Sequence, residues 1–207
     1  ANISQFMSNN FINVNGAALD SKGRNYVNSN SALSALNTWL KTQTDTNVIP
    51  SNFDSAQLIT GTNLIFNLAS EHVGLAYLAG SCSISSKCSI VEDLFEFSSF
   101  TTVAHEFAHQ LGVLHDAENN PNNLSECMKK FNYLMSDALS GNVNRLYLSP
   151  CTINTLLQNI ITNNGYSCMA NVPSVASDFQ YYGSFFPGQL LNLTEQCMTS
   201  FNSSYYP

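Results

Sequence analysis

Residues 101–116 read TTVAHEFAHQLGVLHD, and this stretch holds three of the four histidines of the chain. Residues four apart on an α-helix lie on one face, so His105 and His109 project side by side and can reach one ion. His115 lies too far along the axis to join them from the same helix, so the chain must turn back. Gly112 suits that turn because glycine adopts a positive φ without a Cβ penalty. The spacing therefore predicts one metal site, built from a helix and the turn that follows it.

The donor set of this stretch favours zinc. Three protein ligands with one open position are the usual arrangement where zinc is catalytic, and imidazole nitrogens suit this ion. A closed structural site would need a fourth protein ligand, and no further Cys or His stands at ligand spacing nearby. Glu106 lies beside the two helical histidines, within reach of a water molecule at the metal. We therefore predict a catalytic zinc site in which Glu106 is general base and later general acid.

Composition and charge limit the partners of the protein. The chain has 207 residues, 7 basic and 14 acidic side chains, and a formal net charge of −7. Because the basic residues are scattered, we expect neither nucleic acid nor an anionic membrane as a partner. No apolar run approaches the roughly 20 residues of a membrane-spanning helix, and no signal peptide is evident. We expect a soluble, processed, monomeric protein with one domain and an appendage.

Cysteines and glycosylation sequons point to an extracellular protein. Six cysteines lie far apart without the CxxC spacing of a thiolate zinc site, and their even number fits three disulfides. Spacing alone does not determine which cysteines pair. Sequons for N-glycosylation begin at Asn2, Asn123, Asn192 and Asn202. The sequence therefore predicts a secreted protein.

Two further segments have helical periodicity. Residues 31–43 begin with a capping-type Ser31 and place four apolar side chains on one face: Leu33, Leu36, Trp39 and Leu40. Residues 149–165 begin with a capping Ser149 and Pro150 in the first turn, and they end in Asn-Asn-Gly. The apolar face of this second segment consists of Ile153, Leu156, Leu157, Ile160 and Ile161.

Short apolar runs of strand length lie between these helical segments: NLIFNLAS (63–70), VGLAYLAG (73–80) and SIVEDLF (89–95). Because helix and strand alternate, an α/β layer is the predicted plan. Residues 117–148 are rich in Asn and Ser, which predicts irregular chain pinned by a disulfide. From residue 171 onward the sequence is aromatic and punctuated by Gly and Pro, which predicts an appendage.

The run HEFAHQLGVLHD (105–116) resembles the zinc motif of the metzincin endopeptidases. The Asp after the third His resembles the adamalysin (reprolysin) branch, which includes the ADAM and ADAMTS proteases and snake-venom metalloproteases. The metzincin pattern also calls for a methionine in a tight turn below the zinc. Met135 in NYLMSD stands at a fitting distance, and Met128 is the second candidate. With SNFDSAQLITG, VGLAYLAGSCSISSKCSIVED and LSPCTI, the resemblance covers most of residues 39–201.

This resemblance implies a fold and a domain organisation. Residues 1–170 would form an α/β metzincin catalytic domain: a twisted, mostly parallel sheet with one antiparallel edge strand, helices on its faces and a small irregular C-terminal subdomain. Residues 171–207 would be a tail resembling the start of a disintegrin-like module, which the segment FFPGQLLNLTEQCMTSF carries. The chain before His105 is shorter than in the family, so its N-terminal part was either trimmed or rebuilt from residues 1–30.

The resemblance also implies residue roles. His105, His109 and His115 would bind zinc, and Glu106 would be the catalytic acid and base. Met135 would pack beneath the ligands, while Asp116 would either tie the ligand turn to the C-terminal part or be a solvated turn carboxylate. The substrate would pair with an edge strand, for which a plain core strand is the alternative: Gly74, Leu75, Ala76, Tyr77, Leu78 and Ala79.

Disulfides and a second ion follow from the resemblance alone. It implies Cys82–Cys168 and Cys127–Cys151, which leaves Cys88 to pair with Cys197. It also implies a calcium site from Asp54, the Cys168 carbonyl and Asn171, with a helix or turn cap as the alternative role of Asp54.

The resulting functional hypothesis is a secreted zinc-dependent endopeptidase that hydrolyses extracellular or target-tissue proteins. A venom or salivary setting fits the short architecture and the tail. The alternative is a non-enzymatic protein that binds a receptor or platelet surface through the tail. The complete ligand set and Glu106 favour the enzyme.

Overall fold

The computed structural model describes residues 26–66, 70–83, 85–94, 99–118, 127–137, 143–162 and 166–170, together with Phe6, Thr194 and Glu195. The chain divides into two units, residues 1–170 and 171–207. The disintegrin-like character of the second unit stays a prediction, because nearly all of this unit lies outside the described residues. Six residues from the predicted sites also lie outside them: Asn2, Asn123, Asn171, Asn192, Cys197 and Asn202.

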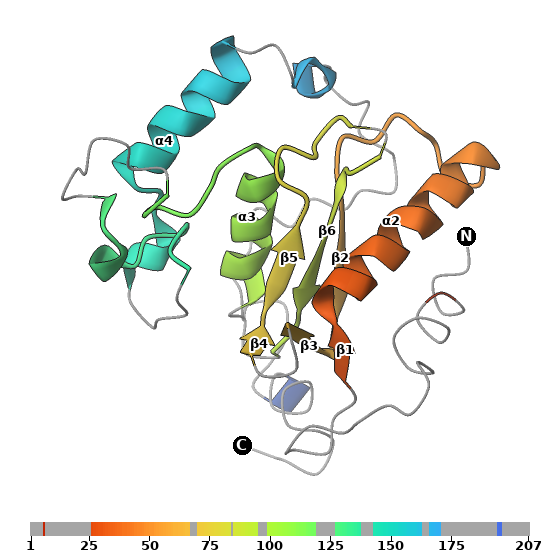
Figure 1. Ribbon diagram of the computed structural model, residues 1–207, viewed down its shortest axis with the longest axis horizontal. Coiled ribbons are helices and arrows are strands. Elements are labelled where there is room, and N and C mark those ends of the chain that lie inside the picture. The colour runs from red at the N-terminus through yellow and green to blue at the C-terminus, as the bar shows by residue number, and fades with distance from the viewer. Residues whose placement is uncertain are drawn as a thin grey trace. The chain divides into compact units, whose positions relative to one another are not determined.

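The strands form two three-stranded sheets (Figure 1). One has the order β1 (Tyr26–Asn28), β3 (Asn63–Phe66), β4 (Ser70–His72), with β1 parallel to β3 and β4 antiparallel to it. The other has the order β2 (Ala56–Thr60), β6 (Cys88–Glu92), β5 (Gly74–Ala76), with β2 parallel to β6 and β5 antiparallel to it. The predicted α/β class, with parallel strands and an antiparallel edge strand, is confirmed.

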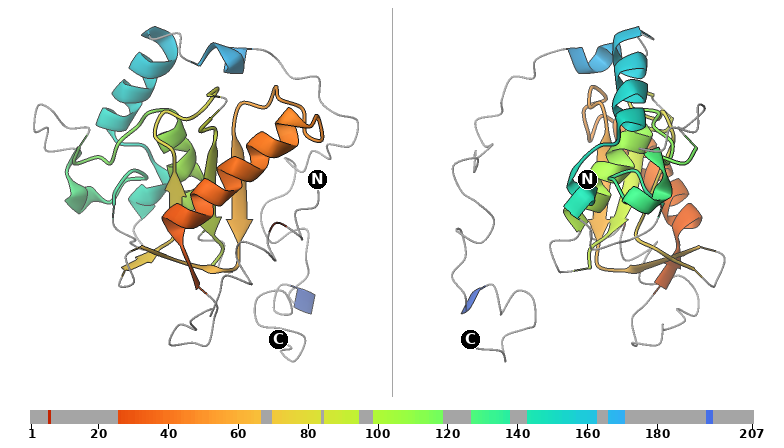
Figure 2. Two further views of the ribbon diagram at one scale, coloured as in Figure 1. Left: turned by 45° about the vertical axis from the view of Figure 1, so that its right-hand side comes forward. Right: turned by 90° about the vertical axis from the view of Figure 1, so that its left-hand side faces the viewer.

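Helix α2 (Ser29–Asp45) and helix α3 (Ser99–Gln110) lie on opposite sides of the β2-β6-β5 sheet (Figure 2). Alternation along β6 explains this arrangement, since Cys88 and Ile90 point into the core beneath α2. From α2 the buried side chains Leu33, Leu36 and Leu40 meet them, and the Trp39 ring packs on Phe6. The sheet is therefore covered on both faces, as parallel strands require.

Helix α2 begins earlier than predicted, because its N-cap is Asn28 and not Ser31. The Asn28 side chain accepts a hydrogen bond from the Ser31 N–H at 3.1 Å. Asn is as good a capping residue as Ser, and Asn28 is the last residue of β1, so the helix starts as soon as the strand ends.

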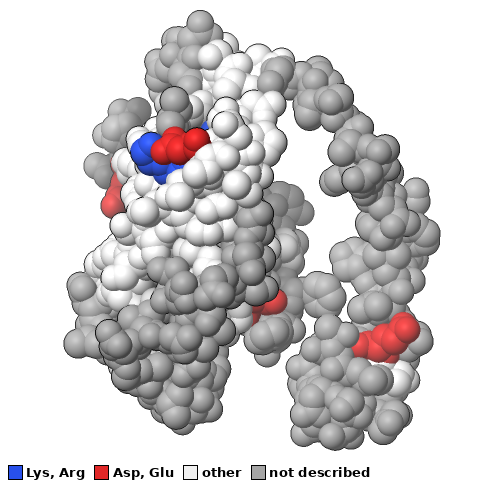
Figure 3. Space-filling model, turned by 90° about the vertical axis from the view of Figure 1, so that its right-hand side faces the viewer, with Lys and Arg blue, Asp and Glu red and all other residues white. Residues whose placement is uncertain are grey.

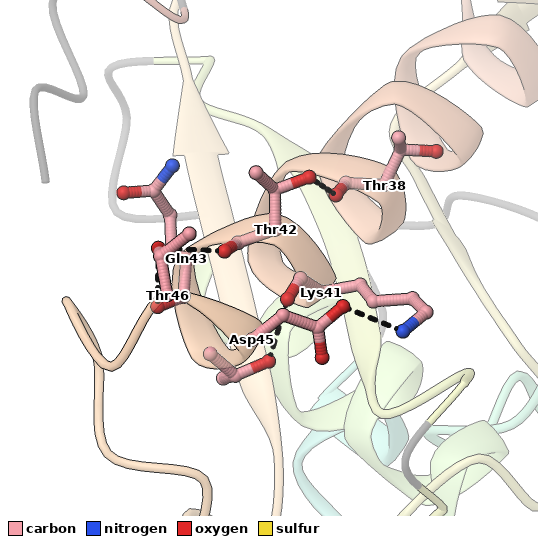
Figure 4. A network of polar contacts seen from close by, with 7 residues as sticks. Thr38, Lys41, Thr42, Gln43, Asp45 and Thr46 are labelled. Atoms are coloured by element: carbon pink, nitrogen blue, oxygen red, sulfur yellow. Dashed lines mark hydrogen bonds and ion pairs between the residues drawn. The ribbon is translucent and has the colours of Figure 1, made fainter.

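The exposed, C-terminal half of α2 is a network of local polar contacts (Figure 4). The Thr42 hydroxyl donates to the Thr38 carbonyl at 2.9 Å, and the Thr46 hydroxyl donates to the Thr42 carbonyl at 2.8 Å. Lys41 and Asp45 form an exposed ion pair at 2.7 Å, which contributes little to stability. Charged groups are otherwise sparse on the described surface drawn in Figure 3. The position of α2 is therefore determined by its apolar face.

Helix α4 (Pro150–Leu157) begins as predicted, with Ser149 as N-cap and Pro150 in the first turn. It continues as a π-helical turn, η5 (Gln158–Thr162). Its apolar face is divided: Leu156 packs against the Met135 cluster, whereas Ile161 is 73% exposed. Between α3 and α4 the described chain holds only the short 3-10 helices η3 (Lys129–Phe131) and η4 (Val143–Leu146), and a third, η6 (Ser167–Ala170), follows η5. None of the described helices has the length and apolar composition to cross a bilayer.

Two disulfides brace the first unit, and both were predicted: Cys82–Cys168 and Cys127–Cys151. The predicted pairing of Cys88 with Cys197 is wrong, because Cys88 is a free thiol. Its side chain is fully buried between β6 and α2, with Sγ 3.8 Å from Asn37 Oδ1. Burial raises the pKa of Cys88 to about 12, so this thiol stays protonated at neutral pH.

Candidate functional site

The structure brings the three predicted metal ligands together at the end of α3. His105 Nε2 and His109 Nε2 lie 3.1 Å apart, and the His115 ring centroid is 5.3 Å and 4.8 Å from theirs. One ligand atom from each imidazole lies within 4.8 Å of the others. Two nitrogens at about 2.0–2.1 Å from one tetrahedral zinc would be roughly 3.3 Å apart. The three imidazoles therefore fit a single zinc ion.

The turn after α3 carries His115 back to the helix. Gly112 has φ +79°, and its N–H donates to the His109 carbonyl at 2.9 Å. A Cβ at Gly112 would lie 2.8 Å from Asn159 Nδ2 and 3.0 Å from Tyr166 Oη. The backbone conformation therefore favours glycine here, as the sequence predicts, and any side chain would also displace the ends of Asn159 and Tyr166.

Backbone carbonyls orient the first two imidazoles. The Nδ1–H of His105 donates to the Leu134 carbonyl, and the Nδ1–H of His109 donates to the Val113 carbonyl, both at 2.7 Å. Because a carbonyl only accepts, Nδ1 carries the proton and Nε2 presents its lone pair to the metal position. Burial lowers the pKa of both side chains, that of His105 to about 3. The imidazoles are therefore neutral and able to bind metal over a wide pH range.

His115 has a different neighbour, which sequence reasoning missed. Its Nδ1 lies 3.5 Å from Oε2 of Glu118, and the same oxygen accepts a hydrogen bond from the His115 backbone N–H at 3.1 Å. The Glu118 N–H in turn donates to the His115 carbonyl at 2.9 Å. The sequence did contain a signal for this contact. Glu118 lies three residues after His115, and residues i and i+3 meet in a turn.

Glu106 is buried in the same cluster. Its side chain is only 4% exposed, and burial raises its pKa to about 8. A carboxyl group with a pKa near neutrality is suited to taking up and giving back a proton. Glu106 and the three histidines share a cavity of about 480 Å³. Other residues that line the cavity are Gly74, Leu75, Ala76, Leu78, Ser136 and Arg145.

Arg145 is a further cavity residue that the sequence did not indicate. It lies on η4 and is 7% exposed, and its positive charge contributes to the lowered pKa of His105. A single basic residue in an irregular segment has no periodicity or spacing that could identify it.

Met135 and Asp116 support the ligand turn from below. Met135 is fully buried against Ala108 and Val113, and its carbonyl accepts the Asp116 N–H at 2.9 Å. The Asp116 carboxylate accepts hydrogen bonds from the hydroxyls of Ser149 and Thr152, the latter at 2.9 Å. Asp116 is 2% exposed. It therefore joins the ligand turn to the start of α4 and is not a solvated turn carboxylate.

The second methionine candidate lies outside this buried cluster, whereas the segment after Met135 lines the cavity. Met128 is 41% exposed and takes no part in the buried cluster. Ser136 and Asp137, which follow Met135, line the cavity.

The predicted substrate strand is partly a strand and partly a turn. Of the predicted residues 74–79, only residues 74–76 form a strand, β5, which pairs with β6. β5 is the terminal strand of its sheet. Tyr77 continues the strand with a hydrogen bond to the Cys88 carbonyl at 3.5 Å, whereas Leu78 and Ala79 form a turn. The Ala79 N–H donates to the His109 carbonyl at 2.9 Å, so this turn is fastened to α3.

Asp54 lies beside the Cys82–Cys168 disulfide, and its backbone carbonyl accepts the Cys82 N–H at 2.9 Å. The sulfur atoms near it are bonded to each other and are therefore not metal ligands. Asn171 lies outside the described residues. The calcium site stays a prediction.

Comparisons with known proteins place the chain among metalloproteases. The model described as "Reprolysin (M12B) family zinc metalloprotease" matches residues 21–173. "A disintegrin and metalloproteinase with thrombospondin motifs 18" from Homo sapiens is 31% identical over 152 residues, which is 72% of this chain and 12% of that protein. The human relative with thrombospondin motifs 6 is 32% identical over 174 residues, 80% of this chain and 15% of its own. The chain thus spans a small part of the length of these relatives.

Proposed function

The chain belongs to the reprolysin (M12B) family of zinc metalloproteases, and from this premise we propose that it is a zinc-dependent endopeptidase. One observation carries the proposal. Three imidazoles that fit one zinc ion and a buried carboxyl group share a cavity with β5, the terminal strand of its sheet among the described residues. A metal, a proton acceptor and a surface for an extended peptide are the parts that peptide hydrolysis requires.

His105, His109 and His115 would hold the zinc through Nε2 or, for His115, through the ring nitrogen turned from Glu118. When bound, zinc supplies Lewis-acid polarisation of the scissile carbonyl and makes a water molecule more acidic. The Glu106 carboxylate accepts the proton of the attacking water. The same carboxyl group then donates this proton to the departing amine nitrogen, which breaks the peptide bond and leaves Glu106 ionised again.

The substrate would add to β5 as an extended strand. β5 pairs with β6 on one side, and its other edge carries the backbone groups that an incoming peptide can pair with. Backbone hydrogen bonds of this kind supply affinity for any extended sequence, whereas side-chain pockets supply selectivity. Protein or peptide chains are therefore the substrate class.

Secretion is the second part of the proposal. Two disulfides lie in the described part of the chain, and disulfides persist in oxidising compartments. A secreted enzyme would act on extracellular or target-tissue proteins. The proposal also includes glycosylation at the four sequons, a monomeric state and a calcium ion near Asp54. A venom or salivary role is the narrowest form of the proposal and rests on the resemblance alone.

The test is cleavage of a complex peptide mixture, with sequencing of the product termini. The wild-type protein should cut internal bonds, and a zinc chelator or the substitution Glu106→Gln should abolish cutting. The termini would then define the residues preferred on each side of the cleaved bond. If the wild type cuts nothing while zinc is bound, or cuts equally well with Glu106→Gln, the endopeptidase proposal fails and binding through residues 171–207 becomes the better hypothesis.

A further inference from the structure

Gly74 lies where β5 passes close to the Glu106 side chain. A Cβ at Gly74 would lie 2.6 Å from Oε1, 2.8 Å from Cγ and 2.9 Å from Cδ of Glu106. Real Cβ atoms essentially never make contacts below 3.0 Å. The Glu106 side chain therefore occupies the space that the side chain of any other residue at position 74 would need.

Space, and not backbone conformation, is the reason for glycine here. Among the described glycines, Gly112 is the one with a positive φ, so Gly74 adopts a conformation open to any residue. Gly74 also lies in a regular pair, opposite Val91 of β6. In such a strand an alanine would be at least as favourable as glycine if its methyl group had room.

The backbone is held in place on both sides of this contact. Just before Gly74, the Val73 carbonyl accepts the Glu92 N–H at 2.8 Å, which holds the start of β5. Further along, the Ser81 N–H donates to the Gln110 carbonyl at 3.1 Å, which fastens the chain after β5 to the end of α3. Glu106 lies inside α3 and is 4% exposed.

We propose that Gly74 is a positioning residue for Glu106: its missing side chain lets the carboxylate rest on the edge strand that also pairs with the substrate. This inference rests on the proposed endopeptidase function. Proton transfer requires Glu106 within about 2.6–3.2 Å of the water it deprotonates. Because one strand would fix both the substrate backbone and the carboxylate, Gly74 sets the distance between the base and the scissile bond.

Gly80 provides a matched control. A Cβ at Gly80 would meet the Ser86 carbonyl oxygen at 2.2 Å and the Tyr77 carbonyl oxygen at 3.0 Å, both of them backbone atoms. Gly80→Ala should therefore disturb the turn after β5 without touching Glu106, and it shows what a purely structural glycine does.

The first test is a double-mutant cycle on stability, measured by denaturant unfolding of zinc-free protein. Gly74→Ala should lower the unfolding midpoint in the wild-type background and lower it much less beside Glu106→Ala, which removes the clashing atoms. Gly80→Ala should lower the midpoint equally in both backgrounds. If Gly74→Ala fails to fold alone but folds beside Glu106→Ala, the contact is supported. Equal loss in both backgrounds, or failure to fold in both, overturns the proposal.

The second test is kinetic and separates positioning from general damage. Gly74→Ala should lower kcat by about 10²-fold, the loss that a displacement near 1 Å produces, with KM and zinc affinity unchanged. A loss carried by KM or by zinc affinity overturns the proposal. If the wild type cleaves nothing, the endopeptidase function fails, and the stability cycle still decides whether Gly74 positions Glu106.

Discussion

Each imidazole of the metal cluster has its own Nδ1 partner, and the partners differ in strength of restraint. Two are backbone carbonyls at 2.7 Å, which move only if the fold moves. The third is the Glu118 carboxylate at 3.5 Å, which is 58% exposed. His115 is therefore the ligand whose orientation a single side-chain substitution can loosen.

Removing that carboxylate should weaken zinc binding. Glu118→Ala removes the oxygen that lies beside His115 Nδ1 and that also accepts the hydrogen bond of the His115 backbone N–H. We therefore expect zinc affinity to fall by about 10-fold. Competition with a chromogenic chelator measures this affinity. Asp137→Asn is the control, because Asp137 is another exposed carboxylate that lines the same cavity. Equal weakening by both substitutions would show that only the overall charge matters.

The buried imidazoles should make the zinc-free protein sensitive to acid. A group whose pKa is lower in the folded state than in the unfolded state destabilises the fold as pH falls below its unfolded value, near 6.5 for histidine. Burial lowers the pKa of His105 to about 3, so the loss extends from about pH 6.5 down to that value. Glu106 acts in the opposite sense, because its pKa of about 8 lies above the unfolded value. Its contribution changes only above about pH 4.5.

Between pH 4.5 and pH 3 the histidines therefore change the free energy of unfolding, whereas the contribution of Glu106 stays constant. Over this interval the free energy of unfolding of the zinc-free wild type should fall more than that of His105→Gln, as measured by denaturant titration at each pH. If the two proteins lose stability in parallel, His105 already carries its proton in the folded state and the site is more open than described.

Among the elements, α3 and α4 are joined by one buried side chain. The Asp116 carboxylate accepts hydrogen bonds from the hydroxyls of Ser149 and Thr152 at the N-terminus of α4, and its backbone N–H donates to the Met135 carbonyl. The N-cap of α4 is therefore part of the support of the metal site. This connection explains why an acidic residue follows the third ligand.

Truncating Asp116 should lower the stability of the fold before it affects catalysis. Asp116→Ala leaves two buried hydroxyls without their acceptor, at about 1–3 kcal/mol for each unsatisfied group. Urea unfolding measures the loss. Asp45→Ala, which removes an exposed carboxylate from α2, should stay within about 0.5 kcal/mol of the wild type. A loss no larger for Asp116→Ala than for Asp45→Ala would contradict the buried role of Asp116.

Periodicity predicted the helices well and their limits less well. The apolar spacing of Leu33, Leu36 and Leu40 identified α2, but Asn28 and Ser31 are both good caps, and only the end of β1 decides between them. For α4 the Ser149-Pro150 pair specified the start. Sequence could not show that Ile161 faces outward, because exposure depends on which elements lie nearby.

Over the whole chain, features that depend on a local sequence motif could be predicted better than contacts between residues far apart in the sequence. Residues 105–116 contain the three predicted ligands and Glu106 within one helix and one turn, so spacing was sufficient to predict that these side chains meet. Cys88 was assigned a disulfide because the number of cysteines is even, yet its position in a central strand buries it among apolar side chains. The contact between Gly74 and Glu106 joins separate elements, and no local pattern in either segment reports it.

The central claim is that one zinc ion, held by three histidines beside Glu106, gives the chain its activity. The most direct test is a titration of the zinc-free protein with zinc while cleavage of a peptide substrate is followed. Activity should rise linearly from zero and reach its plateau at one zinc per chain, and Glu106→Gln should bind the same single ion with cleavage reduced by about 10²- to 10⁴-fold. Cleavage without zinc, or full cleavage by Glu106→Gln, would contradict the account.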